Sequence, residues 1–97
     1  MTLDIRLTPQ ARADLDGIWN FSTAKWGMDQ AEAYLLVLDT TMRILAGQPG
    51  LGRSIAEIRS GYFKFPSASH ILIYRLKPGA IEFVRLLYKS MDVERHL

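Results

Sequence analysis

The first quarter of the chain passes from a two-residue to a helical repeat of apolar positions. Residues 3–7 alternate apolar and polar side chains, which predicts a short, edge-like β-strand. Thr8 can then cap a helix, because its hydroxyl accepts an N–H of the first turn, and Pro9 suits the first helical position. We expect this helix to end at Gly27. Its predicted inner stripe consists of Ala11, Leu15, Ile18, Trp19, Ser22 and Trp26.

A second helical stripe follows at once. Asp29 and Glu32 have the spacing of a capping box, which predicts that the second helix starts there. Glycine and proline residues within 47–50 end it. A link this short predicts an antiparallel helical hairpin, whose apolar stripes need another surface to bury against. The second stripe consists of Ala31, Tyr34, Leu35, Leu38, Met42 and Leu45.

The last third of the chain supplies that surface as β-strands. Residues 71–76 and 81–88 are rich in branched and aromatic side chains, with a Pro-Gly turn between them, and predict two strong strands. Residues 54–58 and 62–65 are weaker strand material, for which we expect a short or bulged strand. Strand 81–88 has apolar side chains on both faces, so we expect it to be central. Strict alternation gives it one face of Ile81, Phe83, Arg85 and Leu87 and another of Glu82, Val84, Leu86 and Tyr88.

Length and composition limit the protein class. With 97 residues and 48% hydrophobic side chains, we expect one globular domain over residues 1–97. The lack of cysteine excludes a disulfide framework and a thiolate metal site, and it fits a reducing compartment. The N-terminus has no signal-peptide pattern, and no run approaches the roughly 18 apolar residues of a membrane span. A cytoplasmic protein without membrane contact is therefore expected.

Charge is unevenly distributed along the chain. Residues 1–48 carry four basic and six acidic side chains, whereas residues 49–97 carry eight basic and four acidic ones. The positive second half can meet an acidic protein partner or a phosphate backbone, because both offer fixed negative charge. Direct contact with nucleic acid stays open at this point.

The sequence contains no familiar catalytic or cofactor pattern. It has no nucleophile elbow, no phosphate-binding glycine loop and no metal-ligand spacing, so we expect neither metal nor cofactor. His70 invites a reading as a general base or ligand, but a lone histidine at a strand start is more typical of a hydrogen-bonded structural residue. His96 receives no role.

Five short motifs occur in a fixed order along the chain, and together they resemble those of the RelE/ParE superfamily of bacterial toxins. The ParE branch is the most similar, and the resemblance covers essentially the whole chain. It implies an α+β fold of order β-α-α-β-β-β, in which a helical hairpin packs on a small, curved, mainly antiparallel sheet. The motifs are Thr8-Pro9-Gln10-Ala11-Arg12-Ala13-Asp14-Leu15, Leu45-Ala46-Gly47-Gln48-Pro49-Gly50-Leu51-Gly52, Arg59-Ser60-Gly61-Tyr62, His70 to Arg75, and Arg85 to Asp92.

The resemblance also implies a function. Members of this superfamily are the toxic halves of type II toxin–antitoxin modules, in which a small antitoxin folds over the toxin. ParE-like members are associated with poisoning DNA gyrase and are not known to need a catalytic constellation, whereas RelE-like members cleave messenger RNA in the ribosomal A site. The Met91-Asp92 tail and the long hairpin favour a non-catalytic gyrase poison, bound by a ParD-like antitoxin in a hetero-oligomer. Ribosome-dependent RNA cleavage is the alternative, and a domain that has lost its toxicity is a third.

The two functions call on different residues. A nuclease would use Arg59, Lys64, Arg85 and Tyr88, with added charge from Arg75. Because alternation separates Arg85 from Tyr88, a twist or bulge is needed to bring them to one phosphate. A structural alternative for Arg85 is a hydrogen bond that ties the tail to the sheet, and Tyr88 stands where ParE-like members usually carry His. The target-binding candidates of a gyrase poison are Arg85, Tyr88, Met91, Asp92 and Arg95.

Large apolar side chains are the candidates for binding the antitoxin, through a helix in a groove or an added strand. Tryptophan is enriched in interface hot spots, although tryptophan in a helical stripe more often belongs to the core. We favour a core position for Trp19 and leave Trp26 open. The antitoxin-binding candidates are Trp19, Trp26, Tyr34, Leu38, Tyr62 and Phe65.

Overall fold

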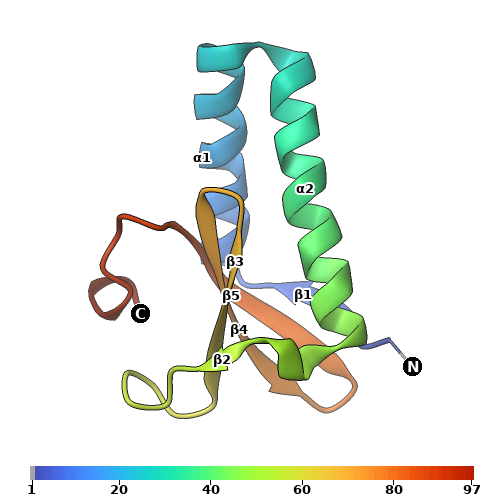
Figure 1. Cartoon of the computed structure of the whole chain (residues 1–97), viewed down its shortest axis with the longest axis vertical. Coiled ribbons are helices and arrows are strands. Elements are labelled where there is room, and N and C mark those ends of the chain that lie inside the picture. The colour runs from blue at the N-terminus through green and yellow to red at the C-terminus, as the bar shows by residue number, and fades with distance from the viewer. Residues whose placement is uncertain (1) are drawn as a thin grey trace.

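The computed structural model describes residues 2–97, in which a helical hairpin packs on one face of a five-stranded sheet (Figure 1). The two helices run side by side, and their linked ends stand clear of the sheet. This arrangement confirms the predicted α+β class. No helix within residues 2–97 is long and apolar enough to cross a membrane. In chain order the elements are β1 (Asp4–Leu7), α1 (Pro9–Trp26), α2 (Met28–Gly47), β2 (Arg53–Ser54), β3 (Tyr62–Ser67), β4 (His70–Lys77) and β5 (Ala80–Tyr88), with 3₁₀ turns at Pro49–Leu51 and Glu94–His96.

The sheet is mixed and mainly antiparallel, with strand order β1-β5-β4-β3-β2. β1 runs parallel to β5, and the other neighbouring strands are antiparallel. β5 therefore has a strand on each side, as its two apolar faces predict. β1 lies at one edge, as its short alternating pattern predicts.

The hairpin begins and turns at capping residues. Thr8 caps α1 by accepting the N–H of Ala11, and Pro9 occupies the first helical position, both as predicted. A single residue, Gly27, links the helices at φ 88°, a backbone conformation that glycine adopts without strain. The predicted capping box at Asp29 is wrong, because α2 already starts at Met28 and has no side-chain cap. Asp29 instead lies in the first turn, where its charge suits the helix dipole.

The short strand expected around residues 54–58 is present, but it covers only Arg53 and Ser54. Only Arg53 and Ser54 pair with β3, and the chain then turns, with the amides of Ile58 and Arg59 both donating to the carbonyl of Ile55. Ile55 and Ile58 are three residues apart, so a turn brings both side chains to the same apolar cluster. A straight strand would point them to opposite faces.

A β-bulge in β5 changes which of its side chains share a face. The register with β4 shifts between Ile73 and Tyr74, which leaves Val84 as the extra residue. As a result, Phe83 and Leu86 both belong to the cluster beneath the helices. Strict alternation put these two on opposite faces, and that prediction is wrong, because one extra residue moves every later side chain by one position.

Two apolar clusters lie on opposite faces of the sheet. The larger one is covered by the hairpin, and its fully buried members include Leu38, Leu45 and Phe83. The second cluster contains no helix residue, and we call its side of the sheet the helix-free face. It consists of Ile55, Tyr62, Ile73, Val84 and Leu87, with Ile58, Ile71, Val93 and Leu97 packed against it.

Tyr74 ties the end of α2 to the sheet. Its ring is fully buried, and its hydroxyl donates to the carbonyl of Pro49 at 2.7 Å and accepts the N–H of Gly52 at 3.0 Å. A Cβ on Gly52 would collide with this hydroxyl, so the close approach requires glycine. Burial also raises the pKa of Tyr74, which keeps the phenol neutral.

We expect Tyr74→Phe to lower the free energy of unfolding by about 1–3 kcal/mol, because Pro49 and Gly52 each lose a buried hydrogen-bond partner. Urea denaturation of the purified chain measures this change. Tyr88→Phe is the matched control, since Tyr88 is 36% exposed and its substitution should cost less than about 0.5 kcal/mol. Equal losses in the two variants would contradict the role assigned to the Tyr74 hydroxyl.

Candidate functional site

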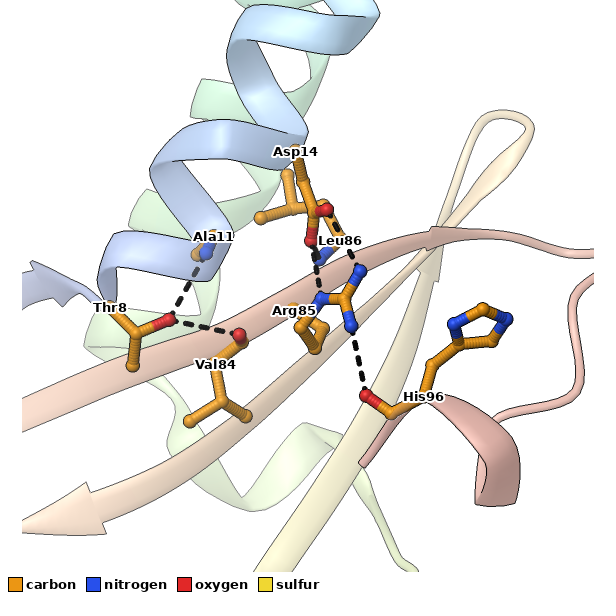
Figure 2. A network of polar contacts seen from close by, with 7 residues as sticks. All are labelled: Thr8, Ala11, Asp14, Val84, Arg85, Leu86 and His96. Carbon is orange, nitrogen blue, oxygen red and sulfur yellow. Dashed lines mark hydrogen bonds and ion pairs between the residues drawn. The ribbon is translucent and has the colours of Figure 1, made fainter.

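The start of α1 covers the edge of β5 at the point where β1 stops. β1 pairs with β5 only as far as Phe83, whose carbonyl accepts the amide of Thr8 at 3.1 Å. The Thr8 hydroxyl, which already caps α1, donates to the carbonyl of Val84 at 2.9 Å. One side chain therefore starts the helix and also replaces a missing strand neighbour (Figure 2).

Asp14 continues this replacement one step along β5. Its carboxylate accepts the amide of Leu86 at 2.9 Å and the Nε and Nη2 groups of Arg85 at 2.8 and 3.0 Å (Figure 2). The side chains of Asp14 and Arg85 are only 16% and 18% exposed. The hydrogen bonds that Arg85 donates to Asp14 are the main reason that the pKa of Arg85 is raised, so the guanidinium stays charged. The carboxylate of Asp14 and the guanidinium of Arg85 therefore form an ion pair with each other.

Arg85 also holds the C-terminal tail. Its Nη1 donates to the carbonyl of His96 at 3.0 Å, as the structural alternative for this residue predicts (Figure 2). Val93 and Leu97 pack on the helix-free face, which anchors the tail at two further points. Arg95 remains exposed, with its Nε 3.7 Å from the carboxylate of Asp92. The tail is therefore attached to the sheet, and its charged side chains point to solvent.

A small hollow of about 200 Å³ lies beside the tail on the helix-free face. Its lining includes three guanidinium groups, those of Arg59, Arg75 and Arg85. Arg59 and Arg75 lie over the ring of Tyr62 at 5.4 and 5.8 Å from its centroid. Arg75 is bonded to Glu82 at 2.7 Å, so both Arg75 and Arg85 already have a carboxylate partner.

The opposite side of the molecule carries a groove lined by aromatic rings. Its centre is a hollow of about 300 Å³ lined by Phe21, Trp26, Tyr34, His70 and Tyr88, and we call it the aromatic groove. Neighbouring rings contact edge to face or tilted, with centroids 6.2 Å apart for Phe21 and Trp26 and 4.2 Å apart for His70 and Tyr88. Two further hollows share these residues and extend the groove along α1 and α2.

His70 lies at the floor of the aromatic groove as a neutral hydrogen-bonding residue. The amide of Ser69 donates to the Tyr34 hydroxyl at 3.0 Å, and the same hydroxyl shares a hydrogen bond of 2.6 Å with Nδ1 of His70. Burial lowers the pKa of His70, more strongly than the charge of Asp14 raises it, which favours the neutral ring. The other ring nitrogen, Nε2, is buried and has no hydrogen-bond partner within residues 2–97.

Large apolar side chains surround the mouth of this groove. Phe21 and Trp26, which line it, are 49% and 47% exposed, and Val37, which lines the adjoining hollow on α2, is also 47% exposed. Lys25 lies 5.5 Å from the Phe21 ring and 5.3 Å from the Trp26 ring, so a cation borders the apolar surface. A contiguous exposed apolar surface with a charged border is typical of a protein-binding site.

The four nuclease candidates are not brought to one place. Arg59 and Arg85 line the hollow beside the tail, whereas Lys64 lines a separate one with Arg53 and Lys89. Tyr88 lies in the aromatic groove, on the other face of β5. The bulge that sequence reasoning invoked does occur, but it lies before Arg85 and leaves the guanidinium and the phenol apart.

The antitoxin-binding candidates also separate. Trp26 and Tyr34 line the aromatic groove, Trp19 is half-buried, and Phe65 packs against the core under the helices. Leu38 is fully buried, so proposing it as a contact was wrong: its position on α2 faces the sheet rather than the surface. Tyr62 lies in the cluster of the helix-free face. Of the target-binding candidates in the tail, Met91, Asp92 and Arg95 are exposed.

Sequence reasoning missed three residues of these sites. Asp14 had a signal, because a carboxylate three residues after Ala11 and four before Ile18 lies on the inner face of α1. Phe21 and Lys25 follow Ile18 and Ser22 by three residues and so flank the predicted stripe, whereas other rings of the groove come from α2, β4 and β5. No cluster of potential metal ligands occurs within residues 2–97.

Comparison with known proteins gives a consistent result. A family model described as "ParE toxin of type II toxin-antitoxin system, parDE" matches residues 5–93. Toxin ParE1 of Caulobacter vibrioides is 39% identical over 92 residues, which cover 95% of each chain, and Toxin ParE1 of Mycobacterium tuberculosis is 45% identical over 92 residues, 94% of each chain. A solved structure titled "Chromosomal ParDE TA system from P. aeruginosa" superposes with a TM-score of 0.77 at 18% identity, covering 90% of this chain and 96% of that one. This last likeness shows the fold.

We expect Asp14→Asn to lower the free energy of unfolding by about 2–4 kcal/mol, because it leaves the charge of Arg85 without its partner in a mostly buried site. Asp39→Asn is the control, since Asp39 pairs with Arg43 at the surface, where the two side chains are 44% and 71% exposed. That change should cost less than about 0.5 kcal/mol. Chemical denaturation of both variants measures the difference, and similar costs would rule out the assigned role of Asp14.

Proposed function

The chain belongs to the ParE toxin family of type II toxin–antitoxin systems, and we propose that it arrests growth by poisoning DNA gyrase until a ParD-like antitoxin binds it. The proposal treats the chain as a binding protein that acts without a catalytic constellation of its own. It also implies a cytoplasmic location, where its proposed target works on DNA.

One observation carries the preference for gyrase over RNA cleavage: Arg85 and Tyr88 lie on opposite faces of β5. General acid–base catalysis needs the acid, the base and the charge-stabilising groups within hydrogen-bond reach of one substrate. Arg85 is held between Asp14 and the tail, and Tyr88 lies against His70. A messenger RNA phosphate held by one residue would therefore be out of reach of the other. This separation supports a toxin that works by binding.

The aromatic groove supports an antitoxin as its occupant. An amphipathic helix buries its apolar face in a groove of this kind and contributes side chains at helical spacing. Trp26 and Phe21 offer large, half-exposed rings, which are typical hot spots. Lys25 at the border favours an acidic residue in the partner. We therefore propose that an apolar helix of the antitoxin with acidic flanks fills the groove.

The choice of target is tested with Tyr88→Phe, which removes only a hydroxyl. A gyrase poison should keep its toxicity within about threefold, because no proton transfer is needed, whereas a nuclease should lose on the order of 10²-fold or more. Growth arrest after induction is measured together with gyrase supercoiling and cleavage assays and with the mapping of transcript ends.

Gyrase cleavage complexes without new transcript ends are the expected result. Transcripts cut in the ribosomal A site, with gyrase unaffected, would overturn the proposal in favour of RNA cleavage. Induction without growth arrest would instead indicate a domain that has lost its toxicity.

The antitoxin site is tested with Trp26→Ala. Loss of a half-exposed aromatic anchor should weaken antitoxin binding by about 30-fold or more, the scale of a 2 kcal/mol hot spot. Ile44→Ala is the matched control: Ile44 is also 47% exposed, but it lies on α2 outside the groove, and its loss should change affinity by less than about threefold. Calorimetric titration with the antitoxin encoded beside the toxin gives both values. Equal affinities of the antitoxin for the two variants would show that it binds outside the aromatic groove.

A further inference from the structure

Charge is segregated between the two layers of the fold. The hairpin, residues 9–47, carries three basic and five acidic side chains. Residues 53–89, which contain β2 to β5, carry seven basic and two acidic ones, a net charge of +5. The largest net charge is therefore in the part of the chain that forms β2 to β5.

Three of these cations surround one hollow on the helix-free face. Arg53, Lys64 and Lys89 line a space of about 260 Å³, with Pro66 and Ile71 as its apolar part, and we call it the cationic hollow. Arg53 and Lys89 are exposed and Lys64 is half-buried. Ile71 packs on the apolar cluster of this face, which fixes the side of the sheet on which the hollow lies.

The arrangement of these cations is unfavourable for the isolated protein. Arg53 of β2 stands directly opposite Lys64 of β3 in the antiparallel register, and like charges in that position destabilise a sheet. None of the three cations forms an ion pair within residues 2–97. By contrast, Arg75 and Lys77 on the neighbouring strand both pair with Glu82. Within residues 2–97, the positive charges of the cationic hollow thus have no carboxylate partner, whereas those of Arg75 and Lys77 are offset by Glu82.

We propose that the cationic hollow binds the phosphate backbone of a DNA duplex. A phosphate between Arg53 and Lys64 would turn their repulsion into two attractions. A duplex carries fixed phosphates close together on a regular surface, which suits three cations contributed by β2, β3 and the end of β5. The site would be insensitive to sequence, because contacts to phosphate position a protein without reading bases.

The lining of the hollow favours a duplex over a single strand. Proteins that bind single strands stack unpaired bases on aromatic rings, and the apolar part of this hollow is formed by Pro66 and Ile71 instead. The rings of the groove that holds Trp26 and Tyr88 belong to the other face. This inference goes beyond the proposed function, since it concerns another face and does not require gyrase to be the target.

The test measures binding of the full chain, made by cell-free translation without antitoxin, to a labelled 30-base-pair duplex of arbitrary sequence. Three phosphate contacts contribute a slope of about −2.7 to the dependence of log affinity on log salt concentration. The triple variant Arg53→Gln, Lys64→Gln, Lys89→Gln should lose that contribution. A fourfold rise in salt concentration should therefore weaken duplex binding by the wild type about 40-fold more than duplex binding by the variant. Each single substitution should reduce the slope by about 0.9.

The control variant carries Arg12→Gln, Lys25→Gln and Arg43→Gln, which remove all three cations of the hairpin and give the same net charge. It should keep the wild-type slope. The hollow variant should also melt at or above the wild-type temperature, because a repulsive cross-strand pair has been removed. The single variants provide the slope measurement if the triple variant does not fold.

Several results would overturn the proposal. These are absence of duplex binding by the wild type at low salt, an unchanged slope in the hollow variants, and an equal loss in the hairpin control. Tighter binding of a single-stranded oligonucleotide would exclude the duplex as the ligand. Preferential binding of poly-glutamate would assign the hollow to an acidic protein instead. None of these results depends on whether gyrase is inhibited. They would disprove duplex binding at the cationic hollow without bearing on the proposed function, which is tested by its own assays.

Discussion

The fold depends on how the open edge of β5 is satisfied. β5 lies inside the sheet, yet β1 pairs with it only through Phe83, and an unpaired backbone group in the interior is costly. Thr8 and Asp14 supply the missing hydrogen bonds from the first turns of α1. This requirement fixes where α1 meets the sheet. The same carboxylate holds Arg85, and through it the carbonyl of His96, so the tail depends on the same contact.

The motifs that carry the family resemblance serve this framework. Thr8 and Asp14 belong to the first motif. Tyr74 belongs to the fourth, and its hydroxyl donates to Pro49 and accepts the N–H of Gly52, both in the second motif. Arg85, in the last motif, is bound at both ends of its guanidinium. Residues used so fully inside the fold leave little for chemistry. The surfaces free for partners, the aromatic groove and the cationic hollow, are built mostly from residues outside these contacts, and they face opposite ways.

Sequence patterns predicted the helices and strands well, but they did not predict the residue-by-residue pairing of the strands. Helix boundaries followed from Thr8, Pro9 and Gly27, whose backbone effects are local. The bulge at Val84 has no comparable signal, because β5 is apolar on both faces and a shift by one residue leaves the pattern plausible. The contact between Asp14 and Arg85 joins positions 71 residues apart, so only the topology that brings α1 beside β5 reveals it. Of the residues that line the aromatic groove, Trp26 and Tyr34 were candidates for binding the antitoxin, whereas Tyr88 was a candidate for binding the target.

A double-mutant cycle on Asp14 and Arg85 tests most directly whether this contact organises the fold. Unfolding free energies are measured for the wild type, Asp14→Asn, Arg85→Gln and the double variant. If the carboxylate and the guanidinium act as one buried unit, the double variant should be less destabilised than the sum of the single variants by about 1–3 kcal/mol. Costs that add within about 0.5 kcal/mol would contradict the account and would show that Arg85 is free for another role.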